Sequence, residues 1–365
     1  MKVCLAADTL LYPSGGHFWV YLNWALGLRQ AGCEVIWLEH CKPALKEDEM
    51  LDGAAVVHRF LDRYGFGASL ALNPRPPAAP SRLPFPLLGL ADAAEADLLL
   101  SLDKLLPAEV VHRFAKAALV DIDPGMTQGW IKLGEYDLPE YHVYFTVGEG
   151  VPPRDAGVEW HHVPPCVALD QWSPTPPAKN AAFTTVTHWA GKWFSEGGEY
   201  YKNDKRAGFL PFLDLPKCTQ HPVELALPIS LDPRPEYASL AERGWRLCDS
   251  ATLSEPAAYQ RYVQSSLGEF SCAKPSYVRL ATAWVSDRTV CYLASGKPAV
   301  VQYTGQSSFL PDTGGLFRFR DLAEAVDHLD AAVANYEENC RLARALAEEH
   351  FDARKVVSRV LELSF

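Results

Sequence analysis

The feature that most constrains the fold is the order of patterns in the N-terminal part of the chain. An apolar run at residues 2–7 predicts a buried strand, and residues 34–39 predict a second one. Between them, the glycine turn Gly15-Gly16 leads into apolar side chains at helical spacing, which end at Gly32. A strand, a glycine loop, a helix and a second strand form a βαβ unit, and such units build parallel sheets.

The same alternation continues in two series, separated by a proline-dense stretch at residues 163–177 that is the natural linker. Further strands are predicted at residues 97–102, 117–122, 142–147, 182–187, 223–227, 269–272 and 298–302, and helices at residues 254–266, 280–295 and from residue 321 almost to the end, with a break near Phe351-Asp352. Residues 73–86 are rich in proline and are expected to form a loop. The simplest description is an α/β chain of two Rossmann-like domains, residues 1–170 and 171–340, with helices at residues 341–365.

Composition excludes several classes of protein. The formal net charge of −11 argues against a general grip on nucleic acid, which needs dense Lys and Arg. No apolar run approaches the length of about 20 residues needed to cross a bilayer, and the N-terminus turns polar too soon for a signal peptide. The 9 cysteines form no Cys-x-x-Cys pair, so we expect reduced thiols in a cytoplasmic protein.

Motifs for other chemistries are missing. The dinucleotide fingerprint Gly-x-Gly-x-x-Gly does not occur in the first glycine loop, which argues against a nicotinamide enzyme. The serine-hydrolase elbow Gly-x-Ser-x-Gly is absent as well. The adjacent pair His161-His162 would point to opposite faces of a strand, so we expect neither a metal site nor a resident cofactor.

The first candidate site is the turn Ser14-Gly15-Gly16-His17, which follows the first predicted strand. Glycines let the backbone turn sharply and approach a ligand, so Gly15 and Gly16 are candidate donor contacts. A histidine has a pKa near neutrality, and His17 is therefore a candidate general base toward an acceptor hydroxyl. The alternative interpretation, which spacing alone favours, is a helix-capping turn with a solvated histidine.

The second candidate site begins at the predicted strand of residues 269–272 and continues into the following helix. Helix N-termini and nearby cations bind phosphate, so Lys274 and Arg288 are candidates for a diphosphate. Asp287 is a candidate acceptor for hydroxyls of a ribose or sugar. The polar neighbours included in this site are Ser271, Tyr277 and Ser286. The alternative makes Asp287 and Arg288 a solvated helix face.

Two further loops are candidates for donor contacts. Tyr303, Thr304 and Gly305 follow a predicted strand, although a plain turn is the more ordinary interpretation. The loop after the first strand of the second series contains Lys192 and, further on, Lys205, whose charges could reach a phosphate. A solvated surface is the alternative for most of these charged residues.

The tryptophans fall into two groups. Trp19, Trp24 and Trp37 are expected in the core of the first βαβ unit. Trp172 and Trp189 lie near the linker and the first loop of the second domain, and they are the better candidates for stacking on a sugar.

These segments resemble a family of bacterial glycosyltransferase-like proteins of the GT-B fold. The matching segments are residues 12–19, 35–39, 121–125, 145–149, 183–189, 269–274, 284–288, 293–298 and 345–352. Their order along the chain carries the resemblance, and the stretch Trp284-Val285-Ser286-Asp287-Arg288 belongs to its strongest part.

The resemblance implies a metal-independent glycosyltransferase. An NDP-sugar donor, with UDP as the expected nucleotide, would bind mainly to the second domain. A small-molecule or glycan acceptor would bind mainly to the first. His17 would be the base, Asp121 is the candidate for orienting it, and the tail helices would pack back toward the first domain.

The chain departs from the family pattern at two positions. Many GT-B enzymes have a glutamate that contacts the donor ribose where this chain has Cys291, and an acid where it has Tyr303. A GT-B sugar-nucleotide epimerase, using acids such as Asp103, Asp121 or Glu149, and a non-catalytic binding protein are the alternative functions.

Overall fold

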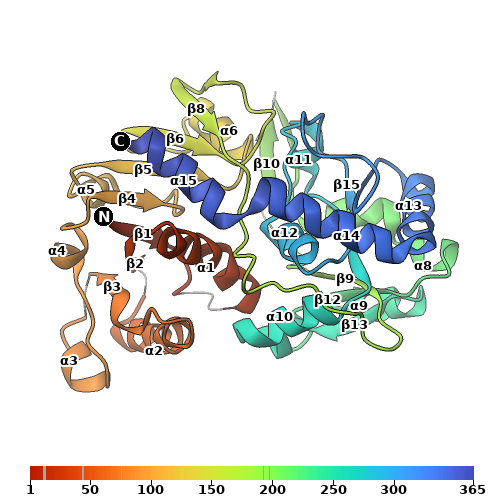
Figure 1. Ribbon diagram of the computed structural model, residues 1–365, viewed down its shortest axis with the longest axis horizontal. Helices are drawn as coiled ribbons and strands as arrows, with labels where there is room; N and C mark the ends of the chain where they lie inside the picture. Colours follow the sequence, from red (N-terminus) through yellow and green to blue (C-terminus); the bar gives the residue numbers. More distant parts are fainter. Residues whose placement is uncertain (11–13, 43–44, 75, 192, 197) are drawn as a thin grey trace.

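The computed structural model describes the chain except for residues 11–13, 43–44, 75, 192 and 197, and it contains two sheets with helices packed around them (Figure 1). The first sheet has 8 strands in the order β3-β2-β1-β4-β5-β6-β8-β7. They are β1 (Lys2–Ala7), β2 (Glu34–His40), β3 (Leu70–Asn73), β4 (Leu98–Ser101), β5 (Ala117–Asp121), β6 (Val143–Thr146), β7 (Arg154–Asp155) and β8 (Val158–His162). The pairs are parallel apart from β7 with β8.

The second sheet has 6 strands in the order β13-β12-β9-β14-β15-β16, and all of its pairs are parallel. They are β9 (Phe183–Val186), β12 (Val223–Leu227), β13 (Arg246–Asp249), β14 (Gly268–Ser271), β15 (Ala299–Gln302) and β16 (Leu316–Phe319). A separate antiparallel hairpin, β10 (Trp193–Glu196) with β11 (Glu199–Lys202), follows β9. Parallel strands covered by helices are buried on both faces, which explains the nearly continuous apolar runs in the sequence.

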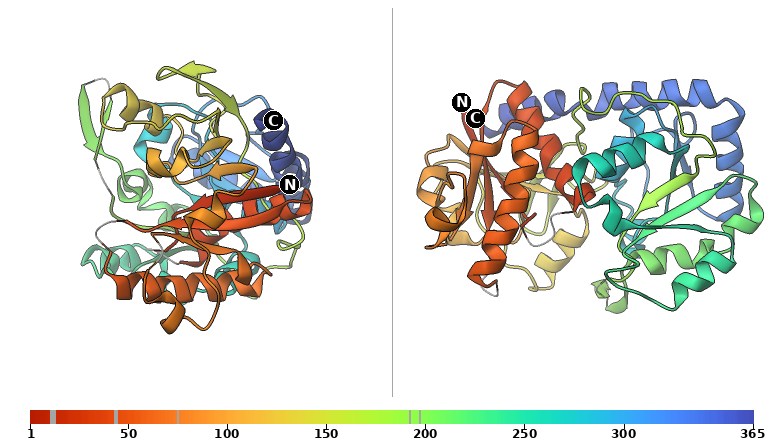
Figure 2. Two further views of the ribbon diagram at one scale, coloured as in Figure 1. Left: turned by 90° about the vertical axis from the view of Figure 1, so that its left-hand side faces the viewer. Right: turned by 90° about the horizontal axis from the view of Figure 1, so that it is seen from below.

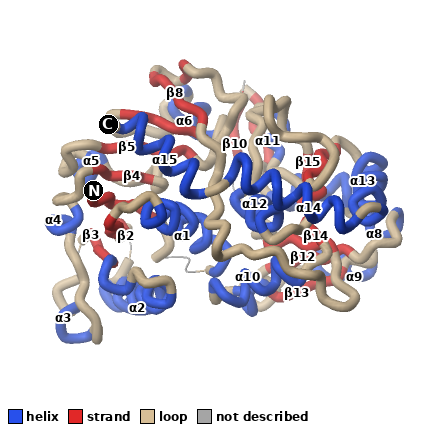
Figure 3. The backbone as a smooth tube through the Cα atoms, viewed as in Figure 1, coloured by secondary structure: helices blue, strands red, loops and turns tan. Residues whose placement is uncertain are grey.

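The helices lie on both sides of the sheets, as the blue segments of Figure 3 show. In the first half they are α1 (Gly15–Gln30), α2 (Glu47–Arg63), η1 (Gly67–Ser69), α3 (Ala79–Arg82), α4 (Leu90–Ala93), α5 (Ala108–Val111) and α6 (Met126–Lys132). In the second half they are α7 (Lys205–Phe209), η2 (Leu210–Phe212), α8 (Leu215–Cys218), α9 (Glu236–Glu242), η3 (Ser250–Leu253), α10 (Pro256–Ser265), α11 (Pro275–Arg279), α12 (Asp287–Ala294), α13 (Leu322–Ala334), α14 (Tyr336–Leu346), η4 (Ala347–Phe351) and α15 (Ala353–Ser364). Within the described residues, no helix is long and apolar enough to cross a bilayer.

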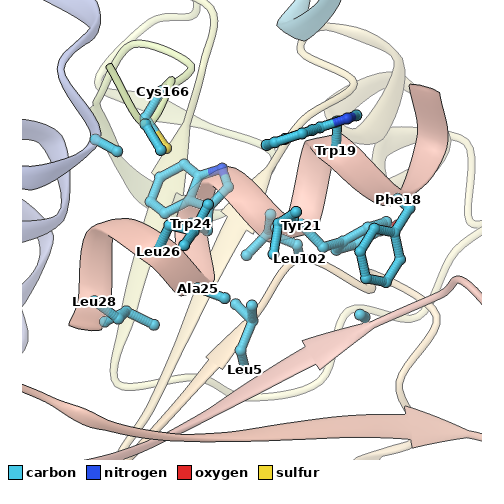
Figure 4. Packing of buried hydrophobic residues seen from close by; sticks show 14 of the residues in the cluster. Leu5, Phe18, Trp19, Tyr21, Trp24, Ala25, Leu26, Leu28, Leu102 and Cys166 are labelled. Carbon is cyan, nitrogen blue, oxygen red and sulfur yellow. The ribbon is translucent and has the colours of Figure 1, made fainter. Parts of the chain in front are cut away.

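Helix α1 is the centre of the first core. Its side chains Phe18, Trp19, Tyr21 and Trp24 are buried in a packed cluster (Figure 4). Phe18 also stacks on Trp37, with ring centroids 5.1 Å apart. Trp19 meets Trp172 of the linker at 4.7 Å and donates its indole N–H to the Pro256 carbonyl in α10. The core of the first half therefore extends into the second, and the predicted core positions of Trp19, Trp24 and Trp37 are confirmed.

The C-terminal helices run along one side of both halves (Figure 1). Helix α14 packs against α12 of the second half, and α15 packs against α1 of the first. The approach of α15 is close: a side chain at Gly27 would lie 2.8 Å from the Ala353 carbonyl. A parallel bridge between Val167 and Asp352 joins this tail to the linker.

The two halves also meet through a loop of the second half, residues 280–285. A Cβ at Gly150 would lie 2.6 Å from the Ala281 carbonyl, and one at Gly125 would lie 2.8 Å from the Leu280 side chain. The Gly150 amide donates to the Thr282 carbonyl at 2.9 Å. The loop of residues 280–285 therefore packs against the glycine turns that follow β5 and β6.

Most predicted strands are confirmed, and several elements differ from the prediction. The helix expected at residues 280–295 begins only at Asp287, because residues 280–285 form the interdomain loop, with Ala281 and Ala283 at positive φ. Residues 47–63 form the helix α2 and residues 70–73 form β3, neither of which was predicted. The short helix α3, residues 79–82, lies within the loop expected at residues 73–86. The hairpin β10–β11 was not predicted.

Candidate functional site

The candidate site lies where the carboxyl ends of the two sheets approach each other. On the first half, Asp8 follows β1, Asp103 lies beyond β4 and Asp123 lies beyond β5. On the second half, His188 follows β9 and Lys274 lies beyond β14. This is the edge at which open α/β sheets bind ligands.

His17 lies in the first turn of α1, half-buried at this edge. Its Nε2 atom is 2.6 Å from the Asp8 carbonyl oxygen. Because a carbonyl oxygen only accepts, Nε2 carries the proton, and the neutral ring presents Nδ1 as an acceptor. Burial lowers the pKa of His17, opposed by the nearby Asp8 and assisted by His188 and Lys42.

Two carboxylates near helix α1, those of Asp8 and Asp103, have opposite surroundings. Asp8 is paired with Lys42, whose Nζ lies 3.1 Å from the carboxylate. Burial, assisted by repulsion from Asp8, raises the pKa of Asp103 to about 6. This side of the site therefore combines a histidine of lowered pKa with an ion pair and an acid of raised pKa.

Asp123 joins the two halves across the interface. Tyr277 of α11 donates its hydroxyl to this carboxylate at 2.6 Å, and Lys104 forms an ion pair with it. Burial opposes ionisation of Asp123, but Lys104 and Lys274 outweigh it and keep its pKa well below the usual range. Asp123 is therefore a permanent anion on the wall of the site.

Two lysines lie on either side of a stacked aromatic pair in the second half. The rings of Tyr277 and Trp284 are parallel, with centroids 4.1 Å apart. The Lys274 ammonium lies 5.8 Å from the Tyr277 ring, and that of Lys205 lies 5.5 Å from the Trp284 ring. Burial and the charges of Arg288 and Lys274 lower the pKa of Lys205 to about 7. Ammonium groups beside aromatic rings are a charge arrangement that can bind a phosphate.

Arg288 has an internal role that spacing did not reveal. Its guanidinium donates to the Glu269 carboxylate at 2.7 Å, to the Ser271 hydroxyl at 2.6 Å and to the Val186 carbonyl at 3.0 Å. Glu269 is fully buried in β14. Arg288 and Ser271 therefore lie together at the base of the site, and their direct contact with a donor stays a prediction.

The start of α12 retains an acid at the site. Ser286 caps the helix by accepting the Arg288 amide. Burial, with repulsion from Asp123, raises the pKa of the following Asp287 to about 7. Cys291, one turn further on, is 2% exposed and points at Asn23 of α1. Asp287 is thus the acid of this helix placed near the site.

The glycines of the first turn serve a contact between the halves. A Cβ at Gly15 would lie 2.5 Å from the Leu253 carbonyl, and one at Gly16 would lie 2.7 Å from the Tyr259 ring. Glycine is therefore needed at both positions because η3 and α10 pack too closely to leave room for a side chain. The prediction that these glycines serve the approach of a ligand missed this packing role. The first-turn amides still lack carbonyl partners within the helix.

Asp121 does not orient His17. Its carboxylate accepts the Thr127 hydroxyl at 2.6 Å, the Gln128 amide at 3.0 Å and the Asp123 amide at 3.0 Å. These bonds tie the end of β5 to the start of α6. Among the described residues, the His17 ring forms its hydrogen bond with the Asp8 carbonyl, so this prediction was wrong.

The predicted sugar-stacking tryptophans are core residues. Trp189 is 2% exposed and lies beside Phe209, with its indole N–H bonded to Glu236. Trp172 is fully buried against Trp19. Neither ring has a face open to a sugar, which corrects both predictions. Lys192 lies outside the described residues.

The loop after β15 supports the interdomain loop. Thr304 is buried and donates its hydroxyl to the Trp284 carbonyl at 2.6 Å. A Cβ at Gly305 would lie 2.3 Å from the Ala281 carbonyl. Tyr303 is covered by two guanidinium groups, those of Arg318 at 4.9 Å and Arg320 at 4.1 Å. These three residues shape the site from behind, in place of the predicted donor contact.

Several residues at the site escaped prediction. Asp8, Asp123 and Lys42 follow predicted strands directly or within a few positions, so position at the carboxyl end was the available signal. Trp284 belongs to the segments that carry the resemblance, but its stacking on Tyr277 was not predicted, because it depends on the loop conformation. Within the described part of the chain, no group of three or more His, Cys, Asp or Glu residues is placed to bind a metal ion.

Comparison with known proteins identifies the fold. No protein-family model and no curated sequence matches the chain. Among solved structures, an alpha-glucosyltransferase in complex with UDP superposes with a TM-score of 0.61 at 10% identity, covering 100% of this chain and 99% of that one. Anabaena HepE in complex with UDP-glucose gives 0.58 at 11% identity, covering 100% and 99%. A glycosyltransferase from Rickettsia africae gives 0.54 at 12% identity, covering 100% and 97%. The chain has the GT-B fold, as predicted.

Proposed function

We propose that the protein is a glycosyltransferase that moves a sugar from a nucleoside-diphosphate donor to a hydroxyl of an acceptor. The observation that carries this proposal is the placement of Lys205 and Lys274 at one wall of the interface, with the neutral His17 at the other. The two groups match the two ends of a glycosyl transfer: a leaving diphosphate and an attacking hydroxyl.

On the donor side, the diphosphate would lie between the two ammonium groups and the N-terminus of α12. Negative charge develops on the leaving diphosphate as its bond to the sugar breaks, and fixed cations stabilise that charge. Lys205 has a pKa of about 7 without an anion. A bound diphosphate favours its charged form, so the donor would complete its own site.

On the acceptor side, His17 would take the proton of the attacking hydroxyl at Nδ1. The acceptor oxygen forms a bond to the anomeric carbon, the bond from that carbon to the diphosphate breaks, and the nucleoside diphosphate departs. The Nε2–H bond to the Asp8 carbonyl fixes the tautomer that this step requires. The lowered pKa of His17 keeps the ring neutral at pH 7.

Two further features support this function. Solved structures of similar fold are described with UDP or UDP-glucose bound, so a uridine nucleotide is the first donor to test. The lysines supply the positive charge that a metal ion would otherwise provide, and we therefore propose that transfer needs no metal.

The decisive experiment combines donor binding with catalysis. Thermal shift with UDP, GDP, TDP and their sugars identifies a nucleotide, since a ligand that binds only the folded state stabilises it. Donor hydrolysis or transfer is then measured for the wild type, His17→Ala and Lys274→Met. Loss of turnover with retained nucleotide binding in His17→Ala supports the base, and full activity of that variant contradicts it. Absence of binding to every nucleotide contradicts the proposed function itself.

A further inference from the structure

The hairpin β10–β11 has two faces with opposite surroundings. On its inner face, Phe194 is 2% exposed and lies against α6 of the first half, with its ring 5.9 Å from that of Trp130. Tyr201, on the same face, lies under the Arg279 guanidinium at 4.1 Å. The hairpin is therefore anchored to both halves, although it stands out from the body in the left view of Figure 2.

The outer face exposes two large aromatic rings. Trp193 is 45% exposed and Tyr200 is 69% exposed. Their rings are parallel within 11°, with centroids 5.0 Å apart, and the Lys202 ammonium lies 5.2 Å from the Trp193 ring. Diagonal placement on neighbouring strands brings the rings together. The result is a flat aromatic surface open to solvent with a cation at its edge.

We propose that this outer face is a carbohydrate-binding platform that holds the acceptor glycan, an inference that rests on the proposed function. The C–H face of a pyranose ring packs on a flat aromatic ring, while its hydroxyls need polar partners at the rim. Ser195 and Lys202 lie on the same side of the hairpin as the two rings, and they supply a hydroxyl and an ammonium group.

The platform adjoins a cavity of the second half. Lys202 also lines a neighbouring cavity of about 580 Å³, together with Asp204, Arg206, Arg234 and Glu236. Three residues further along the chain, Lys205 belongs to the lysine pair at the interface. A ligand that covers the rings and this cavity is longer than one sugar, so the acceptor is an oligosaccharide or a longer chain.

A membrane surface is the other class of partner that binds exposed Trp, Tyr and Lys. The chain has a formal net charge of −11. This charge opposes binding to an anionic lipid surface. Carbohydrate is therefore the occupant to which the structure points.

The test uses the full chain and an array of immobilised neutral and acidic oligosaccharides. The wild type is expected to bind at least one of them, and Trp193→Ala and Tyr200→Ala are expected to weaken that binding about tenfold or more. Trp193→Phe keeps a ring and is expected to retain most of it. Phe365→Ala, which removes an exposed ring elsewhere, is the control and is expected to bind like the wild type.

Two readouts separate the possible failures. UDP affinity is measured for each variant and is expected to equal that of the wild type. If the wild type binds an oligosaccharide but no UDP, the proposed function is rejected while carbohydrate binding by the platform stands. Sedimentation with vesicles of equimolar phosphatidylcholine and phosphatidylglycerol tests the other partner. The platform is rejected if the wild type binds no oligosaccharide, if the alanine variants bind normally, or if only vesicles are bound.

Discussion

The hydroxyl of Tyr277 donates a 2.6 Å hydrogen bond to the carboxylate of Asp123, and this bond joins the two halves at the wall of the candidate site. Tyr277 is 2% exposed, and Asp123 is also paired with Lys104. The bond therefore contributes to the closed arrangement in an environment with little solvent screening.

We expect Tyr277→Phe to lower the free energy of unfolding by about 1.5–3 kcal/mol, the usual range for a hydrogen bond to a charged group. Urea denaturation followed by circular dichroism measures the change. Tyr200→Phe, at an exposed position, is the matched control and is expected to change stability by less than about 0.5 kcal/mol. Equal stability of Tyr277→Phe and the wild type would show that the contact does not join the halves in solution.

The ion pair between Arg288 and Glu269 gives a second prediction. Arg288→Met leaves the Glu269 carboxylate, which is fully buried, without its cation. Removing one partner of a buried pair costs about 3–5 kcal/mol. The double variant Arg288→Met/Glu269→Gln is expected to be more stable than the single variant, because the uncompensated charge is gone.

Arg261→Met is the control for this experiment, since Arg261 is exposed on α10. Guanidinium denaturation at pH 7 compares the four proteins. A role in donor binding alone would give the opposite pattern, with nucleotide affinity lost and stability unchanged in Arg288→Met.

The glycine turn that begins α1 leads to a third prediction. A Cβ at Gly15 would meet the carbonyls of Leu253 and Glu255 at 2.5 Å and 2.8 Å. Backbone atoms do not yield easily, so Gly15→Ala is expected to destabilise the protein by about 1–3 kcal/mol. In Gly129→Ala the nearest atom is the tip of the Phe194 ring, at 2.9 Å, and a smaller loss is expected. Thermal unfolding measures the stability of both variants. If Gly15→Ala loses less stability than Gly129→Ala, the close contact of Gly15 with Leu253 and Glu255 is contradicted.

Sequence patterns predicted the sheets because parallel strands carry their signal locally. Runs such as residues 117–120 and 298–301 are apolar throughout, and no tertiary information is needed to recognise them. The start of α12 lacked such a signal. Residues 280–285 have helical spacing, but their seat on Gly125 and Gly150 places Ala281 and Ala283 at positive φ.

The roles of individual site residues were harder to predict, because the type of a residue does not reveal which side chain it pairs with in the folded protein. Lys274 and Arg288 looked alike in sequence, yet Arg288 is paired with Glu269 and the predicted orienting acid Asp121 caps α6. One signal was available: Glu269 is an acid within an apolar strand, and such an acid needs a buried cation. The close contact of Gly15 with η3 had no signal at all.

Glu39 gives a prediction about pH. This fully buried carboxylate accepts the Thr9 amide at 2.9 Å, the Leu10 amide at 3.0 Å and the Trp37 indole N–H at 2.8 Å, and it thereby fixes the start of the loop before α1. Burial outweighs these bonds and raises the pKa of Glu39 from 4.5 to about 7. The folded state therefore binds more protons than the unfolded state between these two pKa values.

Stability is consequently expected to fall as the pH rises from about 4.5 to about 7, by at most about 3 kcal/mol from this residue. The side chain of Glu39→Gln does not titrate, so the stability of this variant is expected to fall less steeply across the window. At acid pH the variant is expected to be less stable than the wild type, because its amide has one oxygen to accept the hydrogen bonds that two carboxyl oxygens accept in Glu39. Urea midpoints across the window measure both slopes. Parallel slopes for the two proteins would exclude a raised pKa for Glu39.

Lys205 links nucleotide binding to proton uptake. Its pKa is about 7 because of burial and the neighbouring charges of Arg288 and Lys274, so at about pH 8 most molecules carry it neutral. A diphosphate placed beside it favours the ammonium form. Binding of UDP at this pH is therefore expected to take up close to one proton from the buffer, and Asp287, with a pKa of about 7, adds to the uptake in the same direction.

Isothermal titration calorimetry in two buffers of different ionisation enthalpy measures this uptake directly. In Lys205→Met the lysine contribution disappears, and UDP affinity is expected to fall about tenfold or more as one cation is lost. Arg206→Met is the control, because Arg206 is exposed and already paired with Glu236. Proton uptake that stays the same in Lys205→Met would place the diphosphate away from this lysine, and proton release in the wild type would contradict the lowered pKa.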